Sequence, residues 1–260
     1  MAGTMLKIDI RRGKILDKLR QDGAVSVAQL AAQLGATTVT IRSDLDALEK
    51  DGYLIRVQGG AVQKNRKHDM VPSTEEKPIT RLEEKKAIAQ AVVQQIRDGD
   101  TLFINSGTTM EVVAQALQCK KSLNIVTNSA RVAAICGTTP SFRVILLGGD
   151  YNAQYGFCYG NDAQNQLRQY QADWALLTLN GISTQGGMTT YHAEEATLNR
   201  LMMEQAKQVL VAGDFTKVGH TGFFRFGQVS PTIQLMTDRK AAPSAVAALR
   251  HAGVKVQIAD

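Results

Sequence analysis

The sequence predicts an α/β protein with an N-terminal winged helix-turn-helix and a C-terminal Rossmann-like domain built on a mostly parallel sheet. Three observations lead to this prediction. The N-terminal quarter contains three short stretches of helical periodicity, followed by a hairpin pattern. From residue 100 onward, compact apolar runs rich in β-branched residues alternate with helical stretches. The surplus of basic residues is concentrated in the N-terminal quarter.

The composition is that of a globular chain long enough for two domains. It has 260 residues, of which 44% are hydrophobic and 21% charged, so a disordered or collagen-like chain is excluded. We expect neither secretion nor membrane insertion, because no apolar run is long enough to span a bilayer or to form a signal peptide. The three cysteines lack a C-x-x-C pair, so we expect reduced thiols and a cytoplasmic location.

The distribution of charge favours a nucleic-acid-binding N-terminal module. The net charge is +6, from 30 Lys and Arg against 24 Asp and Glu. Residues 1–70 carry 12 basic and 8 acidic residues, whereas the remaining 190 residues carry 18 and 16. Two-thirds of the surplus therefore lies in about a quarter of the chain, as expected where a module binds DNA phosphates.

Three short helices are expected in the N-terminal segment, each followed by a glycine that can end it. We place them at residues 11–21, 26–34 and 37–51. The second begins at Ser26, and Gln29 three residues later completes a capping-box pattern. The helix-turn-helix motif then covers about residues 24–43.

Strand and linker patterns follow the third helix. The stretch YLIRVQGGAV alternates apolar and polar residues before a Gly-Gly turn, which predicts the hairpin of a β-wing. Residues 63–79 are polar and charged and contain Pro72 and Pro78, so they are expected to form a linker. The predicted domains are therefore residues 1–62 and 80–260, and the second is expected to start with a helix capped by Thr80.

The third helix is the candidate recognition helix. If its apolar Ile41, Leu45 and Leu48 face the core, its first turns present other side chains to the major groove. Threonine hydroxyls can reach base edges or phosphates, valine can contact a thymine methyl group, and arginine can pair with guanine or phosphate. A winged helix used for protein–protein contact is the alternative. The candidate DNA contacts, including basic residues outside this helix, are Arg11, Arg12, Thr38, Val39, Thr40, Arg42, Ser43 and Arg56.

Polar or glycine-rich turns follow three successive predicted strands of the C-terminal half. In parallel sheets, ligands bind beyond the carboxyl ends of the strands, where backbone N–H groups at a helix start can hold an anion. One such turn alone is also explained as an ordinary turn and cap, but three together favour a small phosphorylated ligand. The candidate ligand residues in these turns are Ser106, Gly107, Thr108, Thr109, Thr127, Asn128, Ser129, Gly148 and Gly149.

Four further candidates lie at or beside later strand ends. Asn180, Glu195, Asp214 and Lys217 could contact a phosphate or sugar hydroxyls, although a lysine near an acid is also explained by a surface ion pair. The histidines lack metal-ligand spacing, and no Walker or G-x-S-x-G pattern occurs. We therefore expect no metal and no cofactor.

Taken together, these motifs resemble one known family. The stretch TTVTIRSDLDALEKDGYLIRVQGGAV is similar to the winged-helix region of the DeoR family of bacterial sugar-metabolism regulators. The segments NSGTT, VTNS, LLGGDY, NGIS, GGMTTYHAEEATLNR and VAGDFTK stand in the order of that family's sensor domain. The resemblance implies a sugar-phosphate-isomerase-type fold for the sensor and a phosphorylated sugar as effector. It also implies a homo-oligomer, dimer or tetramer, that binds a symmetric operator in double-stranded DNA, most often as a repressor.

The sequence departs from the family pattern at three positions. The usual motif T-I-R-R-D-L has a second arginine where Ser43 stands, which implies one fewer DNA contact and an altered operator preference. Asn180 replaces the usual aspartate before Gly181, and Thr178 replaces a more usual glycine. These two changes bear on the identity of the sugar.

The sequence thus leaves two classes of function open. In a repressor, Ser106 to Thr109 and Asn128-Ser129 would hold the phosphate, Lys217 would supply charge, and the remaining candidates would contact hydroxyls. The alternative is a sugar-phosphate isomerase-like enzyme with an appended DNA-binding domain. In such an enzyme, protons would be transferred by Glu195, Asp214 and Lys217. The complete winged helix favours the regulator, because an isomerase has no use for one. An activator would need the same parts.

Overall fold

The computed structural model describes residues 7–50, 54–63, 79–153 and 155–259. These residues divide into two compact units, one ending at Gln63 and one beginning at Ile79, with residues 191–193 grouped with the first. Apart from its two end residues, the predicted linker lies outside the described residues. The predicted end of the third helix also lies outside them. Among the described residues, no helix combines the length and apolar character needed to cross a membrane.

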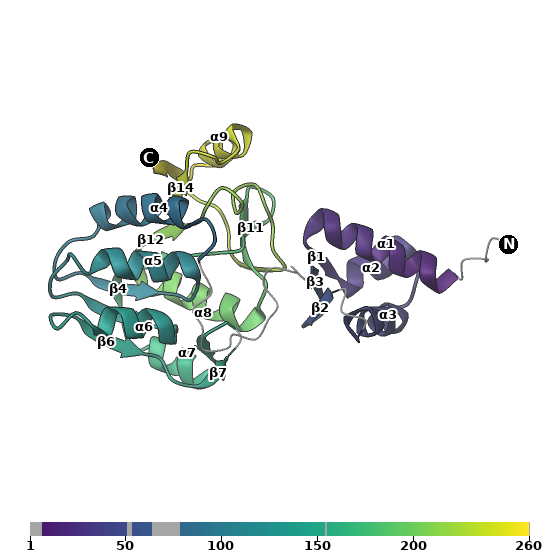
Figure 1. Ribbon diagram of the computed structural model, residues 1–260, viewed down its shortest axis with the longest axis horizontal. Coiled ribbons are helices and arrows are strands. Elements are labelled where there is room, and N and C mark those ends of the chain that lie inside the picture. Colours follow the sequence, from purple (N-terminus) through teal and green to yellow (C-terminus); the bar gives the residue numbers. More distant parts are fainter. Residues whose placement is uncertain (1–6, 51–53, 64–78, 154, 260) are drawn as a thin grey trace. The chain divides into compact units, whose positions relative to one another are not determined.

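The N-terminal unit is a winged helix-turn-helix, as predicted (Figure 1). Its elements are α1 (Lys7–Asp22), β1 (Ala24–Ser26), α2 (Val27–Leu34), α3 (Thr38–Lys50), β2 (Leu54–Val57) and β3 (Gly60–Gln63). The strands form an antiparallel sheet in the order β1-β3-β2. Strand β1 was not predicted, since three residues between two helices carry too little pattern to indicate a strand.

Local signals account for the helix boundaries of this unit. The Ser26 side chain accepts a hydrogen bond from the Gln29 N–H at 3.0 Å, so the predicted N-cap of α2 is confirmed. Gly35 ends α2 in the left-handed conformation (φ 61°), which a side chain would disfavour. The predicted core residues Ile41, Leu45 and Leu48 of α3 are buried, packed with Ile15 and Leu19 of α1.

The C-terminal unit contains a seven-stranded parallel sheet in the order β15-β14-β12-β9-β4-β5-β6. The apolar runs that the sequence shows from residue 100 onward form its strands. These are β4 (Thr101–Ile104), β5 (Asn124–Thr127), β6 (Arg143–Leu146), β9 (Ala172–Leu177), β12 (Ala206–Ala212), β14 (Ile233–Asp238) and β15 (Lys255–Ala259). The central strands β4, β5 and β9 are mostly apolar and buried, because both faces of a parallel sheet are covered.

Helices cover both faces of this sheet, so the predicted Rossmann-like architecture is confirmed. One face packs against α4 (Leu82–Gln95), α5 (Thr108–Leu117) and α6 (Ala130–Gly137), which lie side by side in Figure 1. The opposite face packs against three other helices. These are α7 (Asn161–Leu167), α8 (Ala193–Glu204) and α9 (Pro243–His251).

The strand order places a topological switch point between β4 and β9. The chain begins in the middle of the sheet with β4, adds β5 and β6 on one side, and then adds β9, β12, β14 and β15 on the other. Helices that follow β4 and β9 therefore diverge, leaving a crevice at the carboxyl ends of these two strands where open α/β sheets bind ligands.

Short antiparallel elements, which were not predicted, accompany the sheet. The hairpin β7 (Asp150–Asn152) and β8 (Phe157–Tyr159) follows β6. A small sheet has the order β10-β11-β13, formed by Gly181–Ser183, Gly187–Thr190 and Phe224–Gly227. The predicted cap of α4 was wrong: the helix begins at Leu82 after Arg81, which adopts a left-handed conformation and makes no side-chain cap.

Candidate functional site

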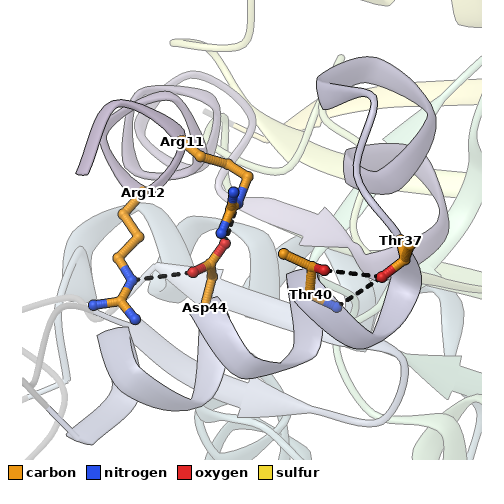
Figure 2. A network of polar contacts seen from close by, with 5 residues as sticks. All are labelled: Arg11, Arg12, Thr37, Thr40 and Asp44. Atoms are coloured by element: carbon orange, nitrogen blue, oxygen red, sulfur yellow. Dashed lines mark hydrogen bonds and ion pairs between the residues drawn. The ribbon is translucent and has the colours of Figure 1, made fainter. Parts of the chain in front are cut away.

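The first turn of α3 presents side chains outward. Thr37 caps the helix, since its hydroxyl accepts the Thr40 N–H at 3.1 Å and lies 2.9 Å from the Thr40 hydroxyl (Figure 2). Thr38 and Val39 are exposed, and 70% of the Val39 surface is accessible. An apolar side chain this exposed has no packing role inside the unit, which leaves it free to contact a partner.

Arg11 and Arg12, two predicted DNA contacts, hold α1 against α3. Both guanidinium groups donate through Nε to the carboxylate of Asp44, Arg12 at 3.1 Å (Figure 2). Asp44 is only 1% exposed, so its charge is compensated by this pair of arginines. The hydrogen bond to Asp44 also raises the pKa of Arg11.

Arg56, the predicted DNA contact of the wing, is anchored in a similar way. Its Nε lies 2.9 Å from a carboxylate oxygen of Asp46, and its Nη1 donates to the Gly60 carbonyl at 2.7 Å. Its backbone N–H donates to the Glu49 carboxylate at 2.6 Å, so the wing is fastened to α3. Arg42 differs, since it is exposed and makes no hydrogen bond or ion pair within the described part of the chain.

At the switch point of the C-terminal unit, Asn105 joins the ends of β4 and β9. Its Oδ1 accepts the Thr178 N–H at 2.9 Å, and its Nδ2 donates to the Thr178 carbonyl at 3.0 Å. The same Nδ2 lies 3.0 Å from Oδ1 of Asn199 on α8. Both polar atoms of the Asn105 side chain are thereby used inside the fold, and this completely buried side chain fixes the geometry of the crevice.

Three predicted ligand residues meet in one hydrogen-bonded group beside this link. Ser106 Oγ donates to one carboxylate oxygen of Glu195 at 3.0 Å, and the hydroxyl of Thr190 contacts the other. The Thr190 hydroxyl also lies 3.0 Å from Oδ1 of Asn180. The prediction that Ser106, Asn180 and Glu195 lie together therefore agrees with the geometry. Thr190, which belongs to the GGMTT stretch at a later strand end, was not among the candidate ligand residues.

This arrangement shifts the pKa of Glu195. Burial raises the pKa of Glu195, which outweighs the opposing effect of the hydrogen bonds from Thr190 and Ser106. A hydroxyl has only one hydrogen, so Thr190 cannot donate to both Glu195 and Asn180. A protonated Glu195 resolves this conflict, because it can donate to Thr190 while Thr190 donates to Asn180.

Gly107 allows the start of α5 to approach the end of β9. Its φ is 132°, and a Cβ at this position would lie 2.6 Å from Cγ2 of Thr178. No side chain caps the start of α5, so its first N–H groups are not occupied by a cap. Thr178, the residue that departs from the usual glycine, thus borders the predicted anion-binding turn.

Lysine side chains lie next to this turn. Nζ of Lys85, on α4, donates to the Thr108 hydroxyl at 2.7 Å, and Lys85 is 5% exposed. Burial lowers the pKa of Lys85, and the charge of nearby Lys217 lowers it further, while Asp214 opposes both. Burial also lowers the pKa of Lys217. The sequence predicted Thr108, Asp214 and Lys217 as ligand residues but missed Lys85.

Asp214 itself organises the loop that carries Lys217. Its carboxylate accepts the N–H of Thr216 at 3.0 Å and contacts the Thr216 hydroxyl. Gly213 lies close beside it, since a Cβ there would lie 3.2 Å from Cβ and Cγ of Lys217. Asp214 therefore holds the conformation of the loop that carries Lys217.

The remaining predicted ligand residues are engaged mainly in holding local structure. Ser129 caps α6 by accepting the Val132 N–H at 3.3 Å, and Thr127 accepts the Ser129 N–H at 3.0 Å. Asn128 is fully buried and donates to the Cys158 carbonyl at 3.2 Å, and its Oδ1 has no partner within the described residues. Of the other three, Thr109 is buried in α5, and the N–H of Gly148 donates to the side-chain oxygen of Gln166. Gly149 lies close to the backbone of Tyr159.

One signal in the sequence could have found Lys85. It belongs to the charged run EEKK, which is typical of a solvated helix face. Its spacing to the buried Ile88 and Ala89 is i+3 and i+4, however, which places it on the apolar stripe of α4. A lysine at a core position is rare unless it is paired or functional. Asn105 and Asn199 carried no comparable signal.

The fold defines a class of protein: a winged helix-turn-helix joined to an α/β domain. Comparison with family models assigns both parts. Residues 11–67 match the DeoR-like helix-turn-helix domain, and residues 80–239 match the DeoR C-terminal sensor domain. The chain belongs to the DeoR family.

Curated relatives resemble the chain along nearly its whole length. The HTH-type transcriptional repressor CsqR of Escherichia coli K12 is 33% identical over 239 residues, covering 92% of this chain and 90% of the relative. The glycerol-3-phosphate regulon repressor of the same strain is 30% identical, with 95% and 98% covered. The lactose phosphotransferase system repressor of Lactococcus lactis is 32% identical, with 90% and 92% covered.

Solved structures include distant neighbours of part of the chain. A D-ribose-5-phosphate isomerase in complex with phospho-erythronic acid is 14% identical, with a TM-score of 0.40 over 54% of this chain and 55% of that chain.

Proposed function

We propose that the protein is a transcriptional repressor of a carbohydrate-utilisation operon and is released from its operator by a phosphorylated sugar. The observation that carries this proposal is the pairing of an exposed recognition-helix start with a polar, lysine-bearing cluster at the sheet's switch point. Curated relatives that cover most of the chain are named as repressors, which supports the regulatory half of the proposal.

On the DNA side, the first turn of α3 would lie in the major groove. Thr38, Val39, Arg42 and Ser43 are exposed and would contact bases and phosphates. The role of three arginines would differ from simple DNA contacts, because each also forms an ion pair with a carboxylate of α3. These are Arg11, Arg12 and Arg56. Their remaining N–H groups can still reach phosphates on either side of the groove.

On the effector side, the start of α5 would hold the phosphate, and the group formed by Glu195, Thr190 and Asn180 would contact sugar hydroxyls. The protein would act as a homo-oligomer on a symmetric operator. Effector binding would favour an arrangement of protomers whose recognition helices no longer match the two half-sites. The protein would thus work in the cytoplasm, on nucleoid DNA.

The test is DNA binding by the purified full chain. Fluorescence anisotropy with DNA from upstream of its own gene should give specific binding that is reversed by one member of a panel of sugar phosphates. Binding that no compound reverses would overturn the proposed effector. Absence of specific binding at moderate salt would overturn the repressor.

Catalysis is a competing function, because Glu195, in the first turn of α8, and Lys217, in the loop after β12, lie at the same edge of the sheet. An isomerase would use such groups to move a proton at a sugar carbonyl. We propose that the chain has no such activity. Incubation with pentose and hexose phosphates, followed by chromatography, should show no isomerised product, and a product removed by Glu195→Gln would contradict this.

A further inference from the structure

Strand β6 is the last strand on one side of the central sheet, so one of its edges faces outward (Figure 1). The N–H group of Arg143 donates to the Leu123 carbonyl at 2.9 Å, and that of Leu147 donates to a carbonyl of β5 at 2.8 Å. Because successive residues of a strand bond to alternate sides, the N–H and C=O groups of Val144 and Leu146 point away from β5. Neither residue uses these groups in a hydrogen bond with any described residue. The edge therefore offers two donors and two acceptors to another strand.

The side chains of this edge are apolar. After Arg143, the strand consists of Val144, Ile145 and Leu146, and Leu146 is 45% exposed. The C-terminal unit has five exposed large apolar side chains among its described residues, and three of them lie between residues 146 and 155. These are Leu146, Tyr151 and Tyr155. A concentration of exposed apolar side chains in one segment marks an interaction surface.

Strand β15, at the opposite edge of the sheet, is protected from pairing with another chain. Its Val256 carbonyl accepts a hydrogen bond from Nη2 of Arg250 at 3.1 Å, and its Lys255 and Gln257 are exposed. Occupied backbone groups and charged side chains are common means by which sheet edges avoid other strands. Strand β6 has a charged side chain only at its first position, so the two edges differ in their capacity to accept a strand.

We propose that β6 pairs antiparallel with β6 of a second copy of the chain, around a two-fold axis at Ile145. In this register Val144 of each copy lies opposite Leu146 of the other, and the two residues exchange both of their backbone hydrogen bonds. All the outward groups of Val144 and Leu146 are then used. Each Leu146 side chain also lies beside a Val144 side chain, which removes apolar surface from water.

Neighbouring backbone contacts select this register over the adjacent ones. Centring the pair on Leu146 would place Val144 opposite Gly148, whose N–H already donates to the Gln166 side chain at 2.9 Å. Centring it on Val144 would place Leu146 opposite Phe142, whose N–H already donates to a carbonyl of the preceding turn at 3.0 Å. Only the register centred on Ile145 gives each outward group of β6 a partner that is not already used.

A second copy is the occupant that this edge fits best. Two identical strands related by a two-fold axis run antiparallel, so each supplies the donors and acceptors that the other needs. The proposal gives a surface to the homo-oligomer of the proposed function and rests on that part of it. It does not involve DNA or the effector, so its test includes neither.

The first experiment measures the molar mass of the purified full chain by size-exclusion chromatography with light scattering. Leu146→Lys places a charge at an exposed position of the edge, and we expect it to lower the molar mass about twofold relative to wild type. Ile258→Lys is the matched control, because Ile258 is a similarly exposed residue of the protected strand β15. This control should keep the wild-type mass.

The second experiment tests the register by cross-linking and does not depend on the lysine variant. Cysteines are introduced in a Cys119→Ser background, since Cys119 is exposed whereas the other two cysteines are buried. On the axis, Ile145→Cys brings two Cα atoms to about 4.5 Å, within the range of a disulfide. Leu146→Cys is more exposed, but its two copies lie diagonally at about 7–8 Å. Mild oxidation should therefore cross-link Ile145→Cys and not Leu146→Cys.

The outcomes separate this interface from the rest of the proposed function. A monomeric wild-type protein would overturn both the interface and the proposed homo-oligomer, and would leave the edge to a different chain. An oligomer that keeps its mass in Leu146→Lys and forms no cross-link at Ile145→Cys would overturn the interface alone. Cross-linking of Leu146→Cys in place of Ile145→Cys would overturn the axis at Ile145.

Discussion

Asn105 and Thr178 exchange two hydrogen bonds, of 2.9 and 3.0 Å, across the point where the order of the parallel strands reverses. Asn105 directly follows β4 and Thr178 directly follows β9, the two central strands. Their side-chain to backbone pairing continues the link between these strands beyond the last residues of the sheet. The polar residues that follow, Ser106 on one side and Asn180 on the other, are positioned by it.

Replacing Asn105 with alanine should therefore destabilise the C-terminal unit. The change removes the bonds to Thr178 and leaves a buried N–H and a carbonyl without partners, with an expected loss of about 3 kcal/mol in the free energy of unfolding. Urea denaturation followed by the fluorescence of Trp174, the single tryptophan and a residue of β9, measures this directly. Asn165→Ala, at an exposed position of α7, should change it by less than about 0.5 kcal/mol.

A second prediction concerns Glu195 and pH. Its pKa is raised by burial, so the folded protein loses stability as pH increases from the unfolded-state value, about 4.3, through the raised folded-state value. Glu195→Gln cannot ionise, so this part of the pH dependence should disappear. Denaturation of both proteins across this pH range, again followed by Trp174, should show parallel curves at low pH and divergence above.

The neighbouring residue supplies the control for this comparison. Glu194 is exposed at the start of α8, so Glu194→Gln should keep the wild-type pH dependence. Equal pH dependence in Glu195→Gln and wild type would show that Glu195 is ionised in the folded protein at the same pH as in the unfolded chain.

These sites also show which features the sequence could predict. The recognition helix was predictable because Ile41, Leu45 and Leu48 follow the helical period, and the central strands were predictable because they are continuously apolar. The role of Asp44 was not predictable, because its position in the sequence does not indicate an interaction with Arg11 and Arg12 of another helix. Long-range polar pairs depend on tertiary geometry, which the local pattern does not encode.

The Asp44 interaction yields a third prediction. Asp44→Asn keeps the shape of the side chain but removes the charge that both arginines share, so the N-terminal unit should lose about 2 kcal/mol of stability. Hydrogen exchange measured by mass spectrometry should be faster in peptides from α1 and α3. The Trp174 unfolding transition of the other unit should not change.

An exposed ion pair of the same unit provides the comparison for Asp44. Asp46, whose side chain is 65% exposed, pairs with Arg56 at 2.9 Å. Asp46→Asn should cost less than about 1 kcal/mol, because exposed ion pairs contribute little. If both variants exchanged at the same rate, the two arginines would not need Asp44 to hold α1 against α3.

The last prediction separates arginines that contact DNA from those that hold the fold. Arg42 is exposed and has no partner within the described residues, so Arg42→Ala should leave stability unchanged. It should weaken operator binding by about 1–3 kcal/mol if it pairs with a base, or lower the slope of log affinity against log salt by about one if it contacts a phosphate. Ser43→Arg places a cation on the next residue and should raise that slope by about one.

Anisotropy titrations at several salt concentrations give both quantities for each variant. Arg97→Ala removes the same charge from an exposed position of the sensor unit and should leave affinity and slope at their wild-type values. A loss of affinity in Arg97→Ala as large as in Arg42→Ala would mean that overall charge, rather than the position of Arg42 on α3, determines binding. An unchanged affinity and slope in Arg42→Ala would remove this residue from the DNA interface and leave the exposed Thr38 and Val39 as the contacts of the first turn.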